Sequence, residues 1–139
     1  MIEGKCLCGK VKVEVSKAPK SFAVCHCISC RNWTGGVFMS VDLGKDFKLS
    51  GEQLVGRYSS SEWAERGFCK ECGSHLFYRM KKSDHYFFML GIFGDQIDPI
   101  FEEQQYIDEK PKTYSFAEKT KVLTKSQMNH MLKTFFSKS

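Results

Sequence analysis

Short segments of alternating apolar and polar residues, separated by Gly, Asp or Ser, make up most of the chain. Val11, Val13 and Val15 alternate with Lys12 and Glu14, and this period of two predicts a strand with one buried face. Further strand candidates are residues 37–41, 47–49, 76–79 and 86–92. The apolar run at positions 87–90 offers both faces for burial, which predicts a central strand. The pattern therefore predicts a mainly β fold of short antiparallel sheets.

One segment near the C-terminal end has the helical period instead. Thr124 and Gln127 have the spacing of a capping box, which predicts a helix over about residues 125–137. The apolar residues at helical spacing in this segment are Met128, Met131, Leu132, Phe135 and Phe136. Two interpretations of this stripe stay open, packing on the protein's own sheet or binding of a partner, and we favour packing. The stretch from Asp95 to Pro111 predicts a loop with room for one edge strand.

Composition sets the size class and the compartment. With 139 residues, 42% of them hydrophobic and 14% aromatic, the chain predicts a single domain, residues 1–139, with a substantial core. It has no 18-residue apolar run, which argues against a membrane span, and MIEGKCLCGK lacks the apolar centre of a signal peptide. We therefore expect a cytoplasmic protein. The net charge of +5 is compatible with nucleic acid, but dispersed Lys and Arg make nucleic acid an unlikely partner.

The spacing of the seven cysteines favours metal over disulfides. They form three clusters: Cys6 and Cys8; Cys25, Cys27 and Cys30; Cys69 and Cys72. Thiols this close along the chain are poor disulfide partners but good chelating pairs, and the count is odd. In a reducing compartment such clusters are typical of zinc sites.

Two of these clusters together supply the four thiolates of a structural zinc site. Cys69 and Cys72 are separated by two residues and followed by Gly73, so a tight turn can aim both sulfurs at one ion. Cys6 and Cys8 lie two apart, on the same side of an extended chain. We expect a structural zinc that ties the N-terminal region to the middle of the chain.

Cys25, Cys27 and Cys30 remain, and no eighth cysteine completes their site. Three protein ligands and one open position are typical of catalytic zinc. Two other interpretations stay open: a second structural site completed by His26 or His75, and a group of free thiols. In an extended chain, His26 points away from the face shared by its neighbours.

Three motifs carry a family resemblance. They are Cys-x-Cys-Gly at residues 6–9, Cys-His-Cys-x-x-Cys-Arg with a following Gly-Gly-x-Phe at 25–38, and Arg-x-Phe-Cys-x-x-Cys-Gly-Ser-x-Leu at 66–76. The chain resembles the family of glutathione-dependent formaldehyde-activating enzymes and centromere protein V over about residues 4–110. The resemblance implies an Mss4-like zinc-bound β fold, with a structural zinc on Cys6, Cys8, Cys69 and Cys72. It assigns Cys25, Cys27 and Cys30 to the zinc of the active site.

The resemblance also implies a function. The family's activity is that of a carbon–sulfur lyase that joins glutathione and formaldehyde as S-hydroxymethylglutathione, so we expect a small thiol such as glutathione as partner. Arg31 and Arg66 are candidate cations for supporting the bound thiolate. The chain departs from many relatives at Gln105-Tyr106-Ile107 and Tyr114, where those relatives carry a His-Ile pair and a Trp. The alternative function is a non-catalytic zinc-binding module for protein or nucleic acid.

Overall fold

The computed structural model describes the backbone of residues 1–138 and the side chains of residues 1–134. Its strands are β1 (Ile2–Lys5), β2 (Lys12–Val15), β3 (Ser21–Cys25), β4 (Phe38–Gly44), β5 (Lys48–Ser50), β6 (Val55–Ser59), β7 (Ala64–Cys69), β8 (His75–Met80), β9 (His85–Met89), β10 (Ile100–Gln105) and β11 (Lys121–Leu123). Its helices are α1 (Ile28–Thr34) and α2 (Lys125–Lys138), with 3₁₀ turns η1 (Glu52–Leu54), η2 (Leu90–Phe93) and η3 (Ile107–Glu109).

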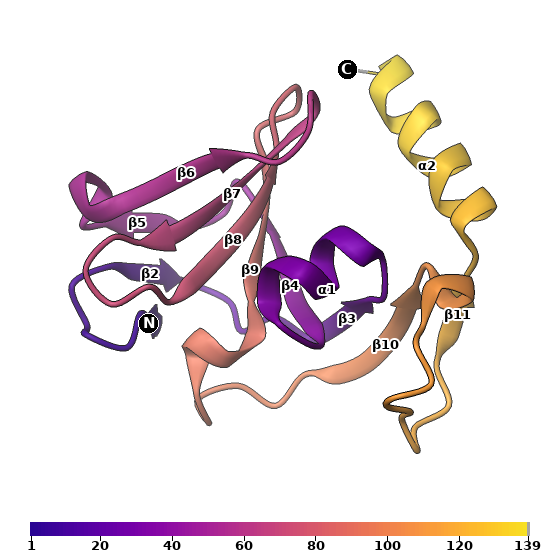
Figure 1. The fold of residues 1–139 in the computed structure, drawn as a ribbon. Helices are drawn as coiled ribbons and strands as arrows, with labels where there is room; N and C mark the ends of the chain where they lie inside the picture. Colours follow the sequence, from indigo (N-terminus) through magenta and orange to yellow (C-terminus); the bar gives the residue numbers. More distant parts are fainter. Residues whose placement is uncertain (139) are drawn as a thin grey trace.

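The strands form two sheets (Figure 1). The smaller has the order β1-β2-β5, and the larger has the order β11-β10-β3-β4-β9-β8-β7-β6. All pairings are antiparallel except those of β10, which runs parallel to both β3 and β11. The predicted mainly β fold with a C-terminal helix is therefore confirmed.

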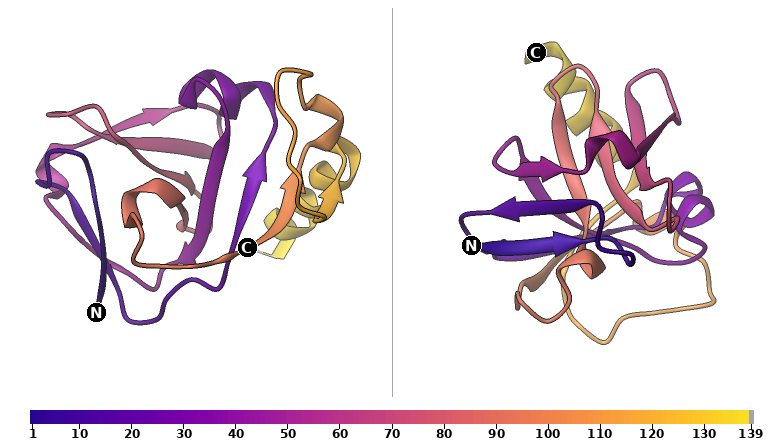
Figure 2. Two further views of the ribbon diagram at one scale, coloured as in Figure 1. Left: turned by 90° about the horizontal axis from the view of Figure 1, so that it is seen from below. Right: turned by 90° about the vertical axis from the view of Figure 1, so that its left-hand side faces the viewer.

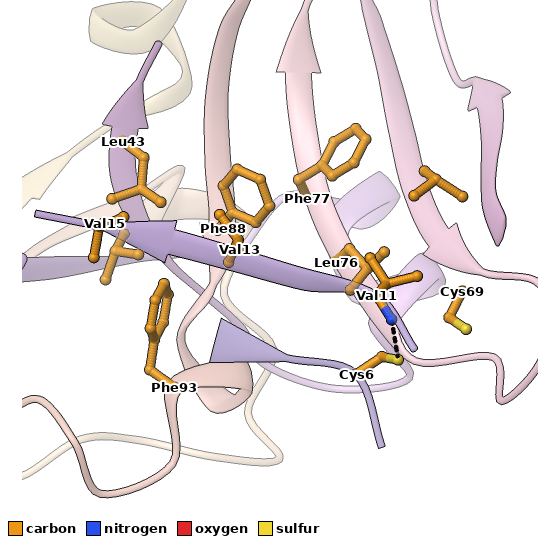
Figure 3. Close-up of a cluster of buried hydrophobic side chains, with 12 residues drawn as sticks. Cys6, Val11, Val13, Val15, Leu43, Cys69, Leu76, Phe77, Phe88 and Phe93 are labelled. Carbon is orange, nitrogen blue, oxygen red and sulfur yellow. Dashed lines mark hydrogen bonds between the residues drawn. The ribbon is translucent and has the colours of Figure 1, made fainter. Parts of the chain in front are cut away.

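The main core lies where the small sheet crosses the large one (Figures 2 and 3). Val13 and Val15 of β2 are buried against Phe77 of β8 and Phe88 of β9, as the alternation predicted. The rings of Phe77 and Phe88 lie 5.4 Å apart between centroids. Gly67 of β7 leaves room for this packing, because a Cβ there would lie 2.2 Å from the Phe77 ring.

Two strand predictions have different outcomes. Strand β9 is paired on both sides, with β4 and β8, as its apolar run predicted. The predicted bounds of 86–92 were wrong at the end, because β9 stops at Met89 and the chain turns into η2. The expected edge strand between Asp95 and Pro111 exists as β10, but it lies inside the sheet between β3 and β11. The prediction was wrong because Gln104 is the only buried residue of β10. A strand with so few buried side chains has the polar composition expected at an edge, although β10 is paired on both sides.

Helix α1 was not predicted. Its seven residues bury one side chain, that of Cys30, so no apolar stripe marks it. Cys27 serves as the N-cap, with its sulfur accepting a hydrogen bond from the Cys30 backbone N–H at 3.4 Å. Gly35 ends the helix in the left-handed conformation with φ 81°.

Helix α2 begins where the capping box predicted. The Gln127 Oε1 accepts from the Thr124 backbone N–H at 2.8 Å, and the Thr124 Oγ1 accepts from the Gln127 N–H at 3.2 Å. Met128 is buried and Met131 is exposed, whereas the side chains of Phe135 and Phe136 lie outside the described residues. Helices long and apolar enough to cross a membrane do not occur in the described part of the chain.

Candidate metal centres and an adjoining cavity

The first cysteine cluster joins the two sheets. Cys6 follows β1, Cys69 ends β7, and Cys8 and Cys72 lie in the turns beyond them. The four sulfurs lie within 4.8 Å of one another, although Cys8 and Cys69 are 61 positions apart in the sequence. The structure therefore brings together the four residues that the sequence predicted as one site.

Two turns of similar design aim these sulfurs. Gly9 and Gly73 follow the second cysteine of each pair with φ of 78° and 76°, a conformation that a side chain would strain. The Val11 backbone N–H donates to the Cys6 Sγ at 3.3 Å (Figure 3). The Ser74 Oγ lies 3.2 Å from the Cys72 Sγ and also accepts from the Leu7 N–H, so it links the two turns.

The spacing of the sulfurs suits a tetrahedral zinc ion. Zn–S bonds near ~2.3 Å place tetrahedral sulfurs about 3.8 Å apart. The Sγ atoms of Cys6 and Cys8 are 3.5 Å apart, and those of Cys8 and Cys69 are 3.8 Å apart. Hydrogen bonds from the Ser74 side chain and backbone lower the pKa of Cys72 to about 5, which favours the thiolate that a metal needs. This cluster could hold a metal ion.

The second cluster lies where β3 passes into α1. Cys25 ends β3, Cys27 caps α1 and Cys30 lies in its first turn, with the three sulfurs within 4.8 Å of one another. Among the described residues no histidine, carboxylate or further cysteine completes the group. Hydrogen bonds with Cys25 and Cys30 lower the pKa of Cys27, so this thiol deprotonates first. The cluster could hold a metal ion with one position left for a ligand.

The two candidate histidine ligands have other contacts. His26 is fully buried, with Nε2 2.8 Å from the Gln104 Oε1 and Nδ1 2.8 Å from the Tyr114 hydroxyl. Because the amide oxygen can only accept, the proton sits on Nε2, and burial lowers the pKa of His26. The His75 ring stacks on Trp33, with centroids 4.1 Å apart. Neither ring belongs to a sulfur cluster, so His26 instead connects the cysteine loop to the segment around Tyr114.

Arg66, rather than Arg31, lies at the second cluster. Its guanidinium is buried and donates to the Cys30 Sγ from Nη1 at 3.7 Å and from Nη2 at 3.6 Å. The faces of Trp33, Phe38 and Tyr78 surround it, with centroids 5.0–5.9 Å from Cζ. Arg31 donates from Nε to the His26 carbonyl at 2.9 Å, which places it beside β3 instead.

A buried guanidinium needs a compensating charge, and among the described residues Arg66 has no ion pair with a carboxylate. The Cys30 sulfur is within its reach, and it would be a thiolate when the cluster holds a metal ion. A divalent ion held by three cysteinates would carry a formal charge of −1 with its ligands, and Arg66 would offset that charge.

We therefore expect Arg66→Met to weaken zinc binding at the second cluster by about 10- to 100-fold, the range found when partners of metal ligands are removed. The methionine keeps the aromatic contacts and removes the charge. Competition with a chromogenic chelator measures the affinity of each site. Arg79→Met on the neighbouring strand is the matched control, because Arg79 pairs with Glu65 and Asp84 at the surface. Equal zinc affinity in Arg66→Met and the unchanged protein would contradict this role.

A cavity of about 420 Å³ opens beside the second cluster, within the range of roughly 300–1,000 Å³ that is common for ligand pockets. Cys25, Cys27 and Cys30 belong to its lining. Tyr78 and Tyr106 line it too; burial raises the pKa of both, to about 12 for Tyr78, so both phenols keep their protons. Tyr106 has φ 55°, a rare conformation for a tyrosine, and such strain is concentrated at functional sites.

Comparison with known proteins agrees with this architecture. Residues 1–109 match the family described as glutathione-dependent formaldehyde-activating enzyme. The chain belongs to this family. A Schizosaccharomyces pombe protein described as an uncharacterized lyase is 35% identical over 123 residues, 88% of this chain and 90% of the yeast protein. A crystal structure of a Rhodobacter sphaeroides protein has a TM-score of 0.53 and 20% identity, covering 70% of this chain and 92% of that one, and supports the fold.

Membership of the formaldehyde-activating family, with a relative described as a lyase, supports an enzyme of lyase type. The region matched to the family ends at residue 109 and includes both cysteine clusters and Tyr106. Helix α2 lies beyond it. Sequence reasoning identified the cysteines and singled out Gln105-Tyr106-Ile107, of which Gln105 and Tyr106 line the cavity. It did not foresee that α2 lines the cavity, because that depends on contacts between distant segments.

Proposed function

We propose that this protein is a zinc-dependent carbon–sulfur lyase that acts on a small thiol adduct, with S-hydroxymethylglutathione as its model substrate. The observation that carries the proposal is the three-cysteine cluster, with no fourth ligand among the described residues, in the lining of a 420 Å³ cavity. Family membership supports the same activity. Arg66, buried against Cys30, supplies a positive charge where a bound thiolate adds a negative one.

The reaction joins a thiol to an aldehyde. A zinc ion held by Cys25, Cys27 and Cys30 would offer its fourth position to the substrate thiol and lower the pKa of that thiol. The thiol releases its proton to solvent, its sulfur attacks the carbonyl carbon, and a C–S bond forms. The π electrons of the C=O bond move to oxygen, which takes up one proton from solvent, so that no net proton is gained or lost. In the reverse direction the same C–S bond breaks and the aldehyde leaves.

The cavity provides hydrogen-bond donors for the oxygen on which this charge develops. The phenol of Tyr106 lines the cavity, and its side chain packs against the cluster that contains Cys25 and Cys30. Tyr78, on strand β8, also lines the cavity, and its ring contacts the Arg66 guanidinium. Donors held in a partly enclosed site stabilise a developing oxyanion more than water does.

Zinc content and turnover together test this proposal. We expect elemental analysis to find close to two zinc ions per chain, and mild chelation to remove the one at the open site first. NMR with ¹³C-formaldehyde and glutathione should show S-hydroxymethylglutathione forming faster than in the uncatalysed reaction, and the acceleration should disappear with the labile zinc. A steady value of one zinc without acceleration would favour the alternative of a non-catalytic binding module.

A further inference from the structure

One face of helix α2 is turned toward the cavity. Lys125, Met128, Asn129 and Leu132 all line it, and their spacing of three and four residues places them along a single side of the helix. Met128 is buried, whereas Met131, three residues further along the helix and outside the cavity lining, is exposed. Met128 and Leu132 of the apolar stripe therefore face space that a ligand can fill, where we had expected direct packing on the sheet.

The opposite wall comes from the large sheet. Phe38 of β4, Tyr78 and Met80 of β8 and Phe87 of β9 line the cavity across from the helix. Figure 1 shows α2 standing at the β11 end of the molecule, away from β6 to β9. A ligand whose sulfur lies at Cys25, Cys27 and Cys30 would extend between these two walls.

Two opposite charges line the α2 side of the cavity. Lys125 is the first residue of α2, and Glu109 ends η3. The segments are joined because the Asp108 Oδ1 accepts from the Lys125 backbone N–H at 2.9 Å. The ion pairs of the described residues include neither Lys125 nor Glu109. A zwitterionic amino-acid group carries one ammonium and one carboxylate, the complement of this pair.

We propose that α2 and η3 form the recognition wall for the thiol, with Lys125 binding the carboxylate and Glu109 the ammonium of an amino-acid group at its far end. The γ-glutamyl end of glutathione is such a group. This assignment rests on the proposed function for the position of the sulfur. It adds a specificity-determining element whose α2 part, at residues 125–132, lies outside the matched family region, whereas Glu109 is the last residue of that region.

Charge reversal at Lys125 tests this wall. Calorimetric titration of the zinc-loaded full chain with glutathione, and separately with 2-mercaptoethanol, compares a thiol that carries the amino-acid group with one that lacks it. We expect Lys125→Glu to raise the Kd for glutathione about tenfold or more and to leave that for 2-mercaptoethanol unchanged. Lys133→Glu makes the same charge change on an exposed position of α2 outside the cavity lining, and we expect it to change neither value.

The outcomes separate this inference from the proposed function. Adduct turnover with a glutathione Kd unchanged by Lys125→Glu would overturn the recognition wall and leave the lyase activity standing. Loss of glutathione affinity in Lys125→Glu alone, without turnover in any variant, would support the wall and overturn the lyase activity. A loss that Lys133→Glu reproduces, or no glutathione binding by the unchanged protein, would overturn the wall.

Discussion

Replacing Cys69 with serine is expected to abolish cooperative folding. Structural zinc in small domains contributes on the order of 10–16 kcal/mol of apparent binding free energy, whereas whole domains are stable by only about 5–15 kcal/mol. Cys69 is fully buried, and its cluster connects the loop after β1 to the end of β7. Without the fourth thiolate, this connection between the two sheets is lost. Circular dichroism during urea titration should show a broad change in place of a sharp transition.

Cys27→Ser provides the comparison for that experiment, since it alters the other cluster. It should unfold cooperatively and retain one zinc ion per chain, while Cys69→Ser should lose the zinc of the first site. A sharp transition in Cys69→Ser at the urea concentration of the unchanged protein would show that this cluster does not stabilise the fold.

The second large effect concerns activity. Cys27→Ser should reduce adduct turnover by about a hundredfold or more, because removing even the partners of metal ligands costs 10- to 100-fold. The fold should persist for a specific reason: Cys27 is the N-cap of α1, and serine is among the best N-cap residues. NMR detection of S-hydroxymethylglutathione formation, together with zinc analysis, measures both consequences.

Ser29→Ala is the matched control for this variant. Ser29 lines the same cavity and lies between Cys27 and Cys30, but it belongs to neither sulfur cluster. It should keep both zinc ions and most of the activity. Unimpaired turnover by Cys27→Ser after loss of the second zinc would exclude that site from the chemistry.

Local patterns in the sequence were enough to predict part of the fold. The alternation of valines before and within β2 corresponds to its buried face, and the capping box at Thr124 marks the start of α2. In contrast, β10 presents a polar face to solvent while it is paired on both sides, so periodicity identified it only as an edge strand. Helix α1 is short and capped by a cysteine, which gave no helical signal.

The candidate site divides in the same way. Cysteine spacing and the following glycines were enough to predict which thiols come together, because each pair is fixed by its own turn. The sequence named both Arg31 and Arg66 as candidate cations, but it could not show which of them lies at Cys30, because Arg66 and Cys30 are 36 positions apart and only the folded chain brings them together. The cavity could not be predicted either, because α2 and β8 both supply residues to its lining and these elements are far apart in the sequence.

The connection between Cys8 and Cys69 also affects how the protein is made. These two sulfurs are 61 positions apart, so the first half of the cluster is synthesised well before the second. At about 5–20 residues per second, a ribosome needs roughly 3 to 12 s to bridge that interval. During this time the nascent chain exposes the paired thiols Cys6 and Cys8 without their partners. If zinc is supplied during this interval and the thiols stay reduced, we expect a higher yield of folded protein.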